Sequence, residues 1–239
     1  MVHAASQIFA DATRTAEYSV IVDSQACLMP HPNPQSQLDS LHAQLRRCRR
    51  CVEAGYFIGS APVFSGPASA RVMVVGQAPA KVETGEQGRP FGLRRGGRRS
   101  LLWEWLAQAG WSEDEFREQQ YLSAITKCYP GKSIGGRGDR VPTAAERELC
   151  RPWREQELAI IQPLVIIPIG RMAIEQFLPE LKGQPLKSFI GQTFSRDSAV
   201  IMPLPHPSGV SRWLNAPENR ARVEQALARL KKLKERFRI

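Results

Sequence analysis

The sequence predicts an α/β fold with three layers, in which a four-stranded, mainly parallel sheet has helices on both faces. Four short apolar segments have the length of buried strands: residues 70–77, 121–128, 163–170 and 199–204. Each is followed by a turn or by a loop rich in glycine or proline, and amphipathic segments separate the first three. Continuous apolar strands that alternate with amphipathic helices are typical of a parallel sheet buried on both faces.

Four segments predict the helices around this sheet: residues 38–51, 101–108, 143–161 and 217–237. Leucines recur at helical spacing in the first, and Asp39 or Ser40 would cap its start. Thr143 and Glu146 have the spacing of a capping box at the start of the third. Apolar residues recur every three or four positions in the last, which indicates a long amphipathic helix.

The chain is expected to divide into two parts. Residues 1–36 predict an N-terminal extension or linker, because prolines at every second position from 30 to 34 disfavour a helix. Residues 37–239 are long enough for one α/β domain with its own core.

The composition favours a polyanionic partner over a membrane. The 33 Lys and Arg residues outnumber the 23 Asp and Glu residues, which gives a net charge of +10. No apolar run approaches the ~18 residues of a membrane-spanning helix, and the first residues lack the features of a signal peptide. We therefore expect a cytoplasmic protein with no membrane partner. We further expect a monomer associated with the bacterial nucleoid.

The cysteines indicate a metal site. Their number, five, is odd and argues against a closed framework of disulfide bonds. Cys48 and Cys51 form a C-x2-C pair, whereas Cys128 and Cys150 come from two other segments. Four thiolates from three segments suit a [4Fe–4S] cluster, and a zinc ion held by the same residues is the alternative. Cys27 lies in the extension and is interpreted as a free thiol.

Three loop motifs follow the predicted strands. In an open parallel sheet, ligands bind beyond the carboxyl ends of the strands. The loops there read GQAPAKVE over residues 76–83, GRPF over 88–91 and HPSG over 206–209. Together with the four cysteines, these motifs resemble the uracil-DNA glycosylase superfamily, in particular its iron–sulfur branch, often called family 4. The resemblance runs from about Cys48 to the C-terminal helix.

The resemblance implies a DNA repair glycosylase that hydrolyses the N-glycosidic bond of a flipped-out damaged base, uracil or another deaminated base, and leaves an abasic site. It implies that Phe91 stacks on the base, that His206 hydrogen-bonds the base carbonyl, and that Glu83 orients water or supports the cationic sugar. Gln77 and Ala78 would frame the base pocket. The implied [4Fe–4S] cluster is structural, and the chemistry needs no metal.

The base-binding set departs from the family pattern. Ala124 and Ser208 complete that set, but Ala124 stands where the family has an Asn that reads the uracil edge. Gln77 replaces a Glu of the first motif. A buried amide supplies a discrimination that a methyl group lacks. The identity of the excised base is therefore open.

Arginines beside the motifs indicate contacts with DNA phosphates, in single- or double-stranded DNA. The cluster that follows the GRPF motif consists of Arg94, Arg95, Arg98 and Arg99. Neighbouring glycines allow close backbone approach, and Arg side chains bind phosphate oxygens; an exposed, solubilising loop is the alternative. Arg212 would contact a further phosphate, while Trp213 either fills the gap left by the flipped base or packs beneath the last helix.

Two other functions remain open. A non-catalytic iron–sulfur protein of the same fold would bind DNA without releasing a base. A third kind of protein would trap the abasic sugar covalently through His206. A glycosylase leaves an alkali-labile abasic site, whereas a binding protein only shifts the DNA in a gel.

Overall fold

The computed structural model describes residues 33–84, 88–92, 100–135, 138–207 and 212–239. The extension up to residue 32 therefore lies outside the described residues, as do several of the residues singled out above: Cys27, Arg94, Arg95, Arg98, Arg99 and Ser208. No helix of the described residues is long and apolar enough to cross a membrane.

The sheet has five strands in the order β2-β1-β3-β5-β4. Their bounds are β1 Val72–Gly76, β2 Tyr121–Ala124, β3 Val165–Pro168, β4 Phe194–Arg196 and β5 Ala199–Ile201. The first three and β5 pair in parallel, as predicted, whereas β4 pairs antiparallel with β5. The prediction of four strands is therefore wrong by one edge strand. Arg196 pairs with Ala199 across a two-residue turn that begins at Asp197, whose φ is 52°.

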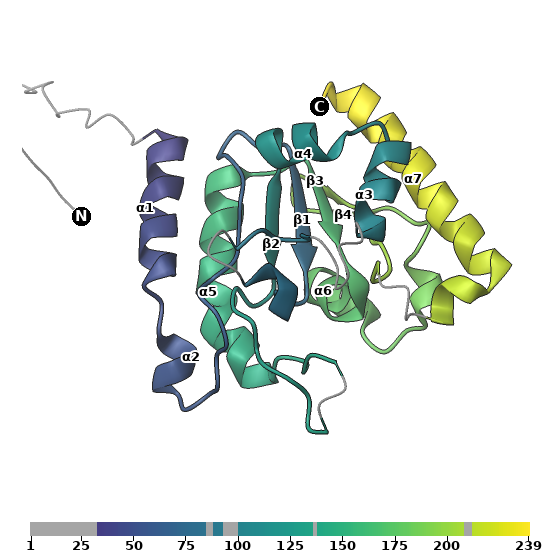
Figure 1. The fold of residues 1–239 in the computed structure, drawn as a ribbon. Helices are drawn as coiled ribbons and strands as arrows, with labels where there is room; N and C mark the ends of the chain where they lie inside the picture. The colour runs from purple at the N-terminus through teal and green to yellow at the C-terminus, as the bar shows by residue number, and fades with distance from the viewer. Residues whose placement is uncertain (1–32, 85–87, 93–99, 136–137, 208–211) are drawn as a thin grey trace, which may run out of the picture. The chain divides into compact units, whose positions relative to one another are not determined.

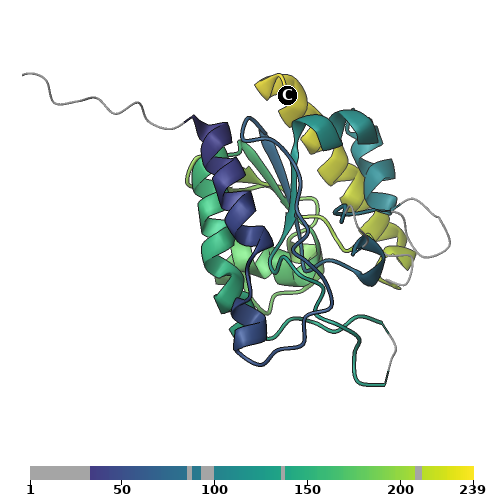
Figure 2. The same cartoon turned by 60° about the vertical axis from the view of Figure 1, so that its left-hand side comes forward.

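Helices cover both faces of the sheet. Figures 1 and 2 show α1 and α5 along one face and α3 and α7 along the other, which gives the predicted three layers. The helices are α1 Pro34–Arg46, α2 Arg50–Glu53, α3 Leu101–Gln108, α4 Glu113–Gln119, α5 Ala144–Ile161, α6 Gly170–Phe177 and α7 Pro217–Phe237. The predictions for α3, α5 and α7 agree to within one residue, and the capping box at Thr143 is present. The single helix predicted over residues 38–51 is in fact two helices, α1 and α2, with a break after Arg46, and α4 and α6 were not predicted.

Helix α1 starts before the predicted position. It begins at Pro34, inside the segment interpreted as a linker, and its cap is Asn33 rather than Asp39 or Ser40. The Asn33 side chain accepts a hydrogen bond from the amide of Gln35 at 2.9 Å. Proline is favoured at the first helical position, because an N–H group there would have no acceptor within the helix and its absence costs nothing.

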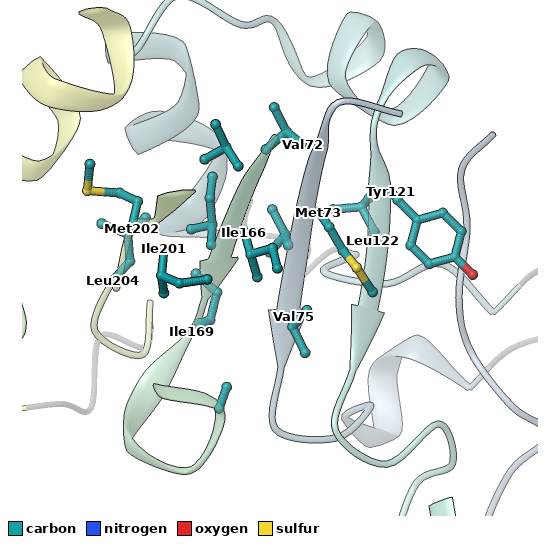
Figure 3. Close-up of a cluster of buried hydrophobic side chains, with 14 of the residues drawn as sticks. Val72, Met73, Val75, Tyr121, Leu122, Ile166, Ile169, Ile201, Met202 and Leu204 are labelled. Carbon is teal, nitrogen blue, oxygen red and sulfur yellow. The ribbon is translucent and has the colours of Figure 1, made fainter. Parts of the chain in front are cut away.

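The core lies between these layers. Side chains from β1, β2, β3, β5 and the segment after β5 meet in Figure 3, and most are completely buried: Val72, Met73, Val75, Tyr121, Leu122, Ile166, Ile169, Ile201, Met202 and Leu204. Burying each large aliphatic side chain contributes roughly 1.5–3 kcal/mol. The buried strands hold the loops at their carboxyl ends in fixed positions.

A buried histidine attaches α1 to the sheet and should make stability depend on pH. His42 Nε2 lies 2.8 Å from the hydroxyl of Tyr121 on β2. Burial, followed by the charge of Arg46, lowers the pKa of His42 from 6.5 to about 4. The unfolded chain therefore takes up a proton below pH 6.5 that the folded chain takes up only near pH 4. The free energy of unfolding should fall by up to about 3 kcal/mol as the pH drops through that window.

Urea unfolding at pH 7 and pH 4.5 measures this loss, with His42→Gln as the comparison. The variant should be less stable than the wild type at pH 7 and lose less stability at pH 4.5. Equal losses in the two proteins would assign the pH dependence to other groups.

Candidate active site and cysteine cluster

The three motif loops converge on one pocket of about 150 Å3 at the carboxyl edge of the sheet. Six of its lining residues are among the predicted site residues: Gln77, Ala78, Glu83, Phe91, Ala124 and His206. The pocket lies beyond β1, β2 and β3, where the chain runs from β1 to β2 on one side and returns to β3 on the other. Such a switch point is where open α/β sheets bind ligands. Its volume is below the roughly 300 Å3 of pockets for drug-sized ligands and suits a single small ring.

Phe91 forms one wall of the pocket in an unusual backbone conformation. Its φ is 53°, in the left-handed region, which costs a residue with a side chain about 1–2 kcal/mol. The ring lies over the end of β1, and a methyl group at Gly76 would stand 3.0 Å from its Cζ atom. Glycine at position 76 therefore permits the close approach of the ring to the strand.

Glu83 joins the first two motif loops. It lies at the end of the 3-10 turn Lys81–Glu83, and its Oε2 accepts the amide hydrogen of Ala80 at 2.9 Å. Backbone hydrogen bonds from Phe91 and Gly92 also reach this carboxylate. Burial raises the pKa of Glu83, and these hydrogen bonds oppose the rise. The carboxylate lines the pocket and at the same time holds the backbone that carries the aromatic wall.

His206 reaches the pocket from the segment that follows β5. Leu204 forms a parallel bridge with Ile169, and its carbonyl accepts the amide of Gly170 at 2.9 Å. This pairing extends the sheet and places His206 beside Gly170, where a methyl group on the glycine would lie 3.5 Å from the His206 Cβ atom. The His206 side chain is exposed and lines the pocket. It can therefore contact a ligand from solvent.

The four predicted ligand cysteines line a second cavity of about 490 Å3. Cys48 lies between α1 and α2, Cys51 in α2, Cys128 after β2 and Cys150 in α5. None of the four forms a disulfide bond. Burial first, and then the charges of the neighbouring thiolates, raise the pKa of Cys51 to about 11. The same arrangement raises the pKa of Cys128 to about 12.

This cavity fits an iron–sulfur cluster. Donors already point at two of the sulfurs: Trp153 Nε1 lies 3.2 Å from Cys48 Sγ, and the Lys127 amide lies 3.4 Å from Cys150 Sγ. The hydroxyl of Thr126, another lining residue, is buried without a hydrogen-bond partner among the described residues. N–H and O–H groups around sulfur ligands are the usual environment of such clusters. Within the described part of the chain, no three potential ligands form a group that could hold a single metal ion.

Comparisons with known proteins identify the family of the chain. A family model described as the uracil DNA glycosylase superfamily matches residues 63–231, which include the pocket and two of the four cysteines. The chain belongs to the uracil-DNA glycosylase superfamily. As a member it is a DNA glycosylase, a hydrolase of N-glycosyl bonds.

Its relatives in the superfamily include proteins of two types. The chain is 31% identical to the Type-4 uracil-DNA glycosylase of Pyrobaculum aerophilum over 62% of its own length and 67% of that protein. It is 27% identical to the Type-4 uracil-DNA glycosylase of Thermotoga maritima, over 70% and 80%. A Type-5 uracil-DNA glycosylase of Thermus thermophilus is 31% identical over 52% and 56%. Several Type-4 relatives at 24–31% identity place the chain in the Type-4-like branch of the superfamily.

Ser123, which sequence analysis missed, also lines the pocket. Its hydroxyl accepts a hydrogen bond from Lys127 Nζ at 2.5 Å and lies 3.1 Å from Glu157 Oε2. These contacts occupy the hydroxyl. Ala124, the neighbouring residue, lines the pocket with a methyl group. Strand β2 therefore contributes little free side-chain polarity to the pocket.

The predicted DNA contacts after the HPSG motif are placed only in part. Arg212 begins the 3-10 turn Arg212–Asn215 and is exposed. Trp213 is half-buried and packs against the core, and its carbonyl accepts a hydrogen bond from Asn219 of α7 at 2.8 Å. These contacts favour the packing role for Trp213 over insertion into DNA.

Proposed function

We propose that the protein removes a deaminated base, uracil or a related one, from DNA by hydrolysis of the N-glycosidic bond. The observation that carries the proposal is the convergence of the three motif loops on one pocket of about 150 Å3 at the carboxyl edge of the sheet. Enzymes that act on a base inside DNA extrude the nucleotide into such a pocket. The open side, where His206 is exposed, is the proposed entrance.

The pocket residues take up the two charges that develop in the reaction. As the bond breaks, the base leaves with the bonding electron pair and the sugar becomes cationic; water then adds to the sugar carbon, and its proton is released. His206 would donate a hydrogen bond to the base oxygen, where negative charge grows. The Glu83 carboxylate would stabilise the sugar cation or orient the water. Phe91 would stack on the base and hold it in position in the pocket.

An assay of abasic product tests the proposal. Oligonucleotides that carry uracil, hypoxanthine, xanthine or a mismatched base are incubated with the protein and then treated with alkali. Strand cleavage at one or more of these bases is the expected result. Because Ala124 cannot supply the amide contacts of an Asn, we expect the protein to accept more than one base. Gel retardation without cleavage of any substrate would favour the non-catalytic DNA-binding function.

A [4Fe–4S] cluster held by Cys48, Cys51, Cys128 and Cys150 is part of the proposal. When bound, it would fasten α2 and α5 to the end of β2, and the catalytic residues above would act without it. A single zinc ion needs all four sulfurs at about 2.3 Å from one point. In a [4Fe–4S] cluster each thiolate binds a different iron atom, so the four sulfurs lie further apart.

Anaerobically purified protein should be brown and contain about four iron atoms per chain. Metal analysis and the visible absorbance spectrum measure this. The variant Cys150→Ser should lose iron and colour, while Cys27→Ser should keep both. Stoichiometric zinc in place of iron would contradict the prediction.

DNA binding by the proposed arginine cluster should depend steeply on salt. Replacing Arg94, Arg95, Arg98 and Arg99 by Ala should lower the slope of log K against log salt by roughly 3–4 units, if each contacts one phosphate. Fluorescence anisotropy with a labelled duplex measures the slope. Four Ala substitutions on the solvent face of α7, at Arg229, Lys231, Lys232 and Arg236, provide a control of equal charge. An equal change in both variants would assign the effect to net charge.

A further inference from the structure

The main chain of Phe91 is held by two side chains outside the motif loops. Trp103 on α3 donates its indole N–H to the Phe91 carbonyl at 2.8 Å. Arg117 on α4 donates to the same carbonyl at 3.0 Å and to the Pro90 carbonyl at 3.0 Å. The Phe91 carbonyl therefore has two side-chain donors from two different helices.

The guanidinium of Arg117 is itself fixed. Its Nε lies 2.9 Å from Glu113 Oε1 one turn earlier in α4. Its carbon Cζ stands 4.3 Å from the centre of the Trp103 indole, in a cation–π contact. The Arg117 and Glu113 side chains are only 16% and 18% exposed, so this arrangement is largely shielded from water. The two donors consequently meet the Phe91 carbonyl as one preorganised unit.

We propose that Arg117 and Trp103 are positioning residues, which hold Phe91 in its left-handed conformation and so keep its ring over the base pocket. A bulky residue rarely takes a positive φ unless its surroundings enforce it. If the two donors to the carbonyl are removed, the peptide is released to the common conformations, and the ring leaves its place above Gly76. Neither side chain lines the pocket, so each acts through Phe91.

This inference rests on the proposed function, because the ring has a catalytic purpose only if a base binds beneath it. Misplacing a reacting group by about 1 Å costs on the order of 100-fold in rate. Arg117→Gln removes the ion pair and the fork of donors, so we expect single-turnover base release to slow by roughly 10- to 100-fold. Duplex affinity should stay unchanged, since Arg117 is turned inward toward two carbonyl oxygens.

A double-mutant cycle separates this role from others. Phe91→Leu, Arg117→Gln and the double variant are compared in single-turnover assays on the best substrate of the oligonucleotide panel. If Arg117 acts through the ring, the double variant is no slower than Phe91→Leu alone. A double variant slowed by the product of the two single effects would overturn the proposal, as would an Arg117→Gln variant with the wild-type rate.

Arg171→Gln is the matched control. Arg171 also pairs with a Glu one turn away, Glu175 at 3.1 Å, and donates to a carbonyl, that of Gln184 at 2.8 Å. It lies on α6 and does not line the pocket. Its substitution should leave the rate within a factor of about two, since surface ion pairs contribute little. Equal slowing by both substitutions would overturn the proposal in favour of a general loss of stability.

A readout without catalysis keeps the inference distinct from the proposed function. 4-Fluorophenylalanine placed at position 91 reports the environment of the ring through its 19F resonance. The resonance should shift or broaden in Arg117→Gln and stay in place in Arg171→Gln. An unchanged resonance in Arg117→Gln overturns the positioning role. Absence of cleavage by the wild type, with the resonance shifted as expected, overturns the proposed function alone.

Discussion

Replacing His206 by Ala should slow single-turnover base release by on the order of 100- to 1000-fold, the usual cost of removing a donor that acts on a developing negative charge. Such a hydrogen bond is stronger in the transition state than in the ground state, so its loss lowers the rate more than the affinity. Iron content should be unchanged, because His206 lies in a different cavity from the cysteines. Duplex affinity should change little, because we assign it mainly to the arginine cluster.

The substitution His206→Asn provides the comparison for this experiment. The amide keeps a donor in place but has a shorter reach, so its rate should lie between those of the wild type and His206→Ala. The same variants test covalent trapping, since a protein–DNA adduct that requires His206 would disappear in both. Wild-type rates in His206→Ala would remove this histidine from the active site.

Much of the fold could be predicted because its signals are local. The apolar runs of β1, β3 and β5 and the capping box at Thr143 depend on neighbouring residues only. The end of β2 was harder to predict, because the apolar pattern continues to Cys128. In the structure, the amides of Ile125 and Thr126 donate hydrogen bonds to the carbonyls of Gly76 and Gln77. The chain therefore follows the motif loop after Ala124 instead of continuing as a strand. The turn at Asp197 could have revealed β4.

The sequence predicted those parts of the candidate site that depend on the side chains of recognisable motifs. The motif residues that line the pocket follow strands whose carboxyl ends share one edge, so their convergence followed from the α/β prediction. The contacts of Arg117 and Trp103 could not be predicted. Both side chains donate to a main-chain carbonyl. Every residue has such a carbonyl, so the sequence does not indicate which one will accept the hydrogen bond.

The pairing of Lys127 with Glu157 was equally hidden, because 29 residues separate them in the sequence. Lys127 Nζ and Glu157 Oε2 lie 2.7 Å apart, and both side chains are completely buried. Lys127 Nζ also donates to the carbonyl of Ala124 at 2.7 Å, and Glu157 accepts the hydroxyl of Tyr121 at 3.1 Å. This network connects β2 to α5 directly behind the base pocket.

Substitution of either partner should therefore be strongly destabilising. Lys127→Met and Glu157→Gln each leave one buried charge uncompensated, which typically costs 3–5 kcal/mol of the free energy of unfolding, so we expect a loss of about that size. The double variant should lose less than the sum of the two, since neither charge remains. Urea unfolding measures the free energy of unfolding of the two single variants and the double variant, provided that its dependence on urea concentration is the same in all of them.

An exposed pair supplies the control. Lys132 lies 3.1 Å from Asp139, with side chains 51% and 31% exposed, and Lys132→Met should change stability by less than about 1 kcal/mol. If Lys127→Met has no larger effect than this control, the buried pair contributes nothing to stability that its neighbours cannot replace.

If Lys127→Met has the expected effect on stability, the consequence extends to function. Lys127 donates from its side chain to the Ala124 carbonyl at the pocket and from its amide to Cys150 at the cysteine cavity. The Lys127→Met substitution removes the side-chain donor but keeps the amide. Base release should therefore decline in the variant, and iron content should decline only as far as loss of the buried pair loosens the contact between β2 and α5.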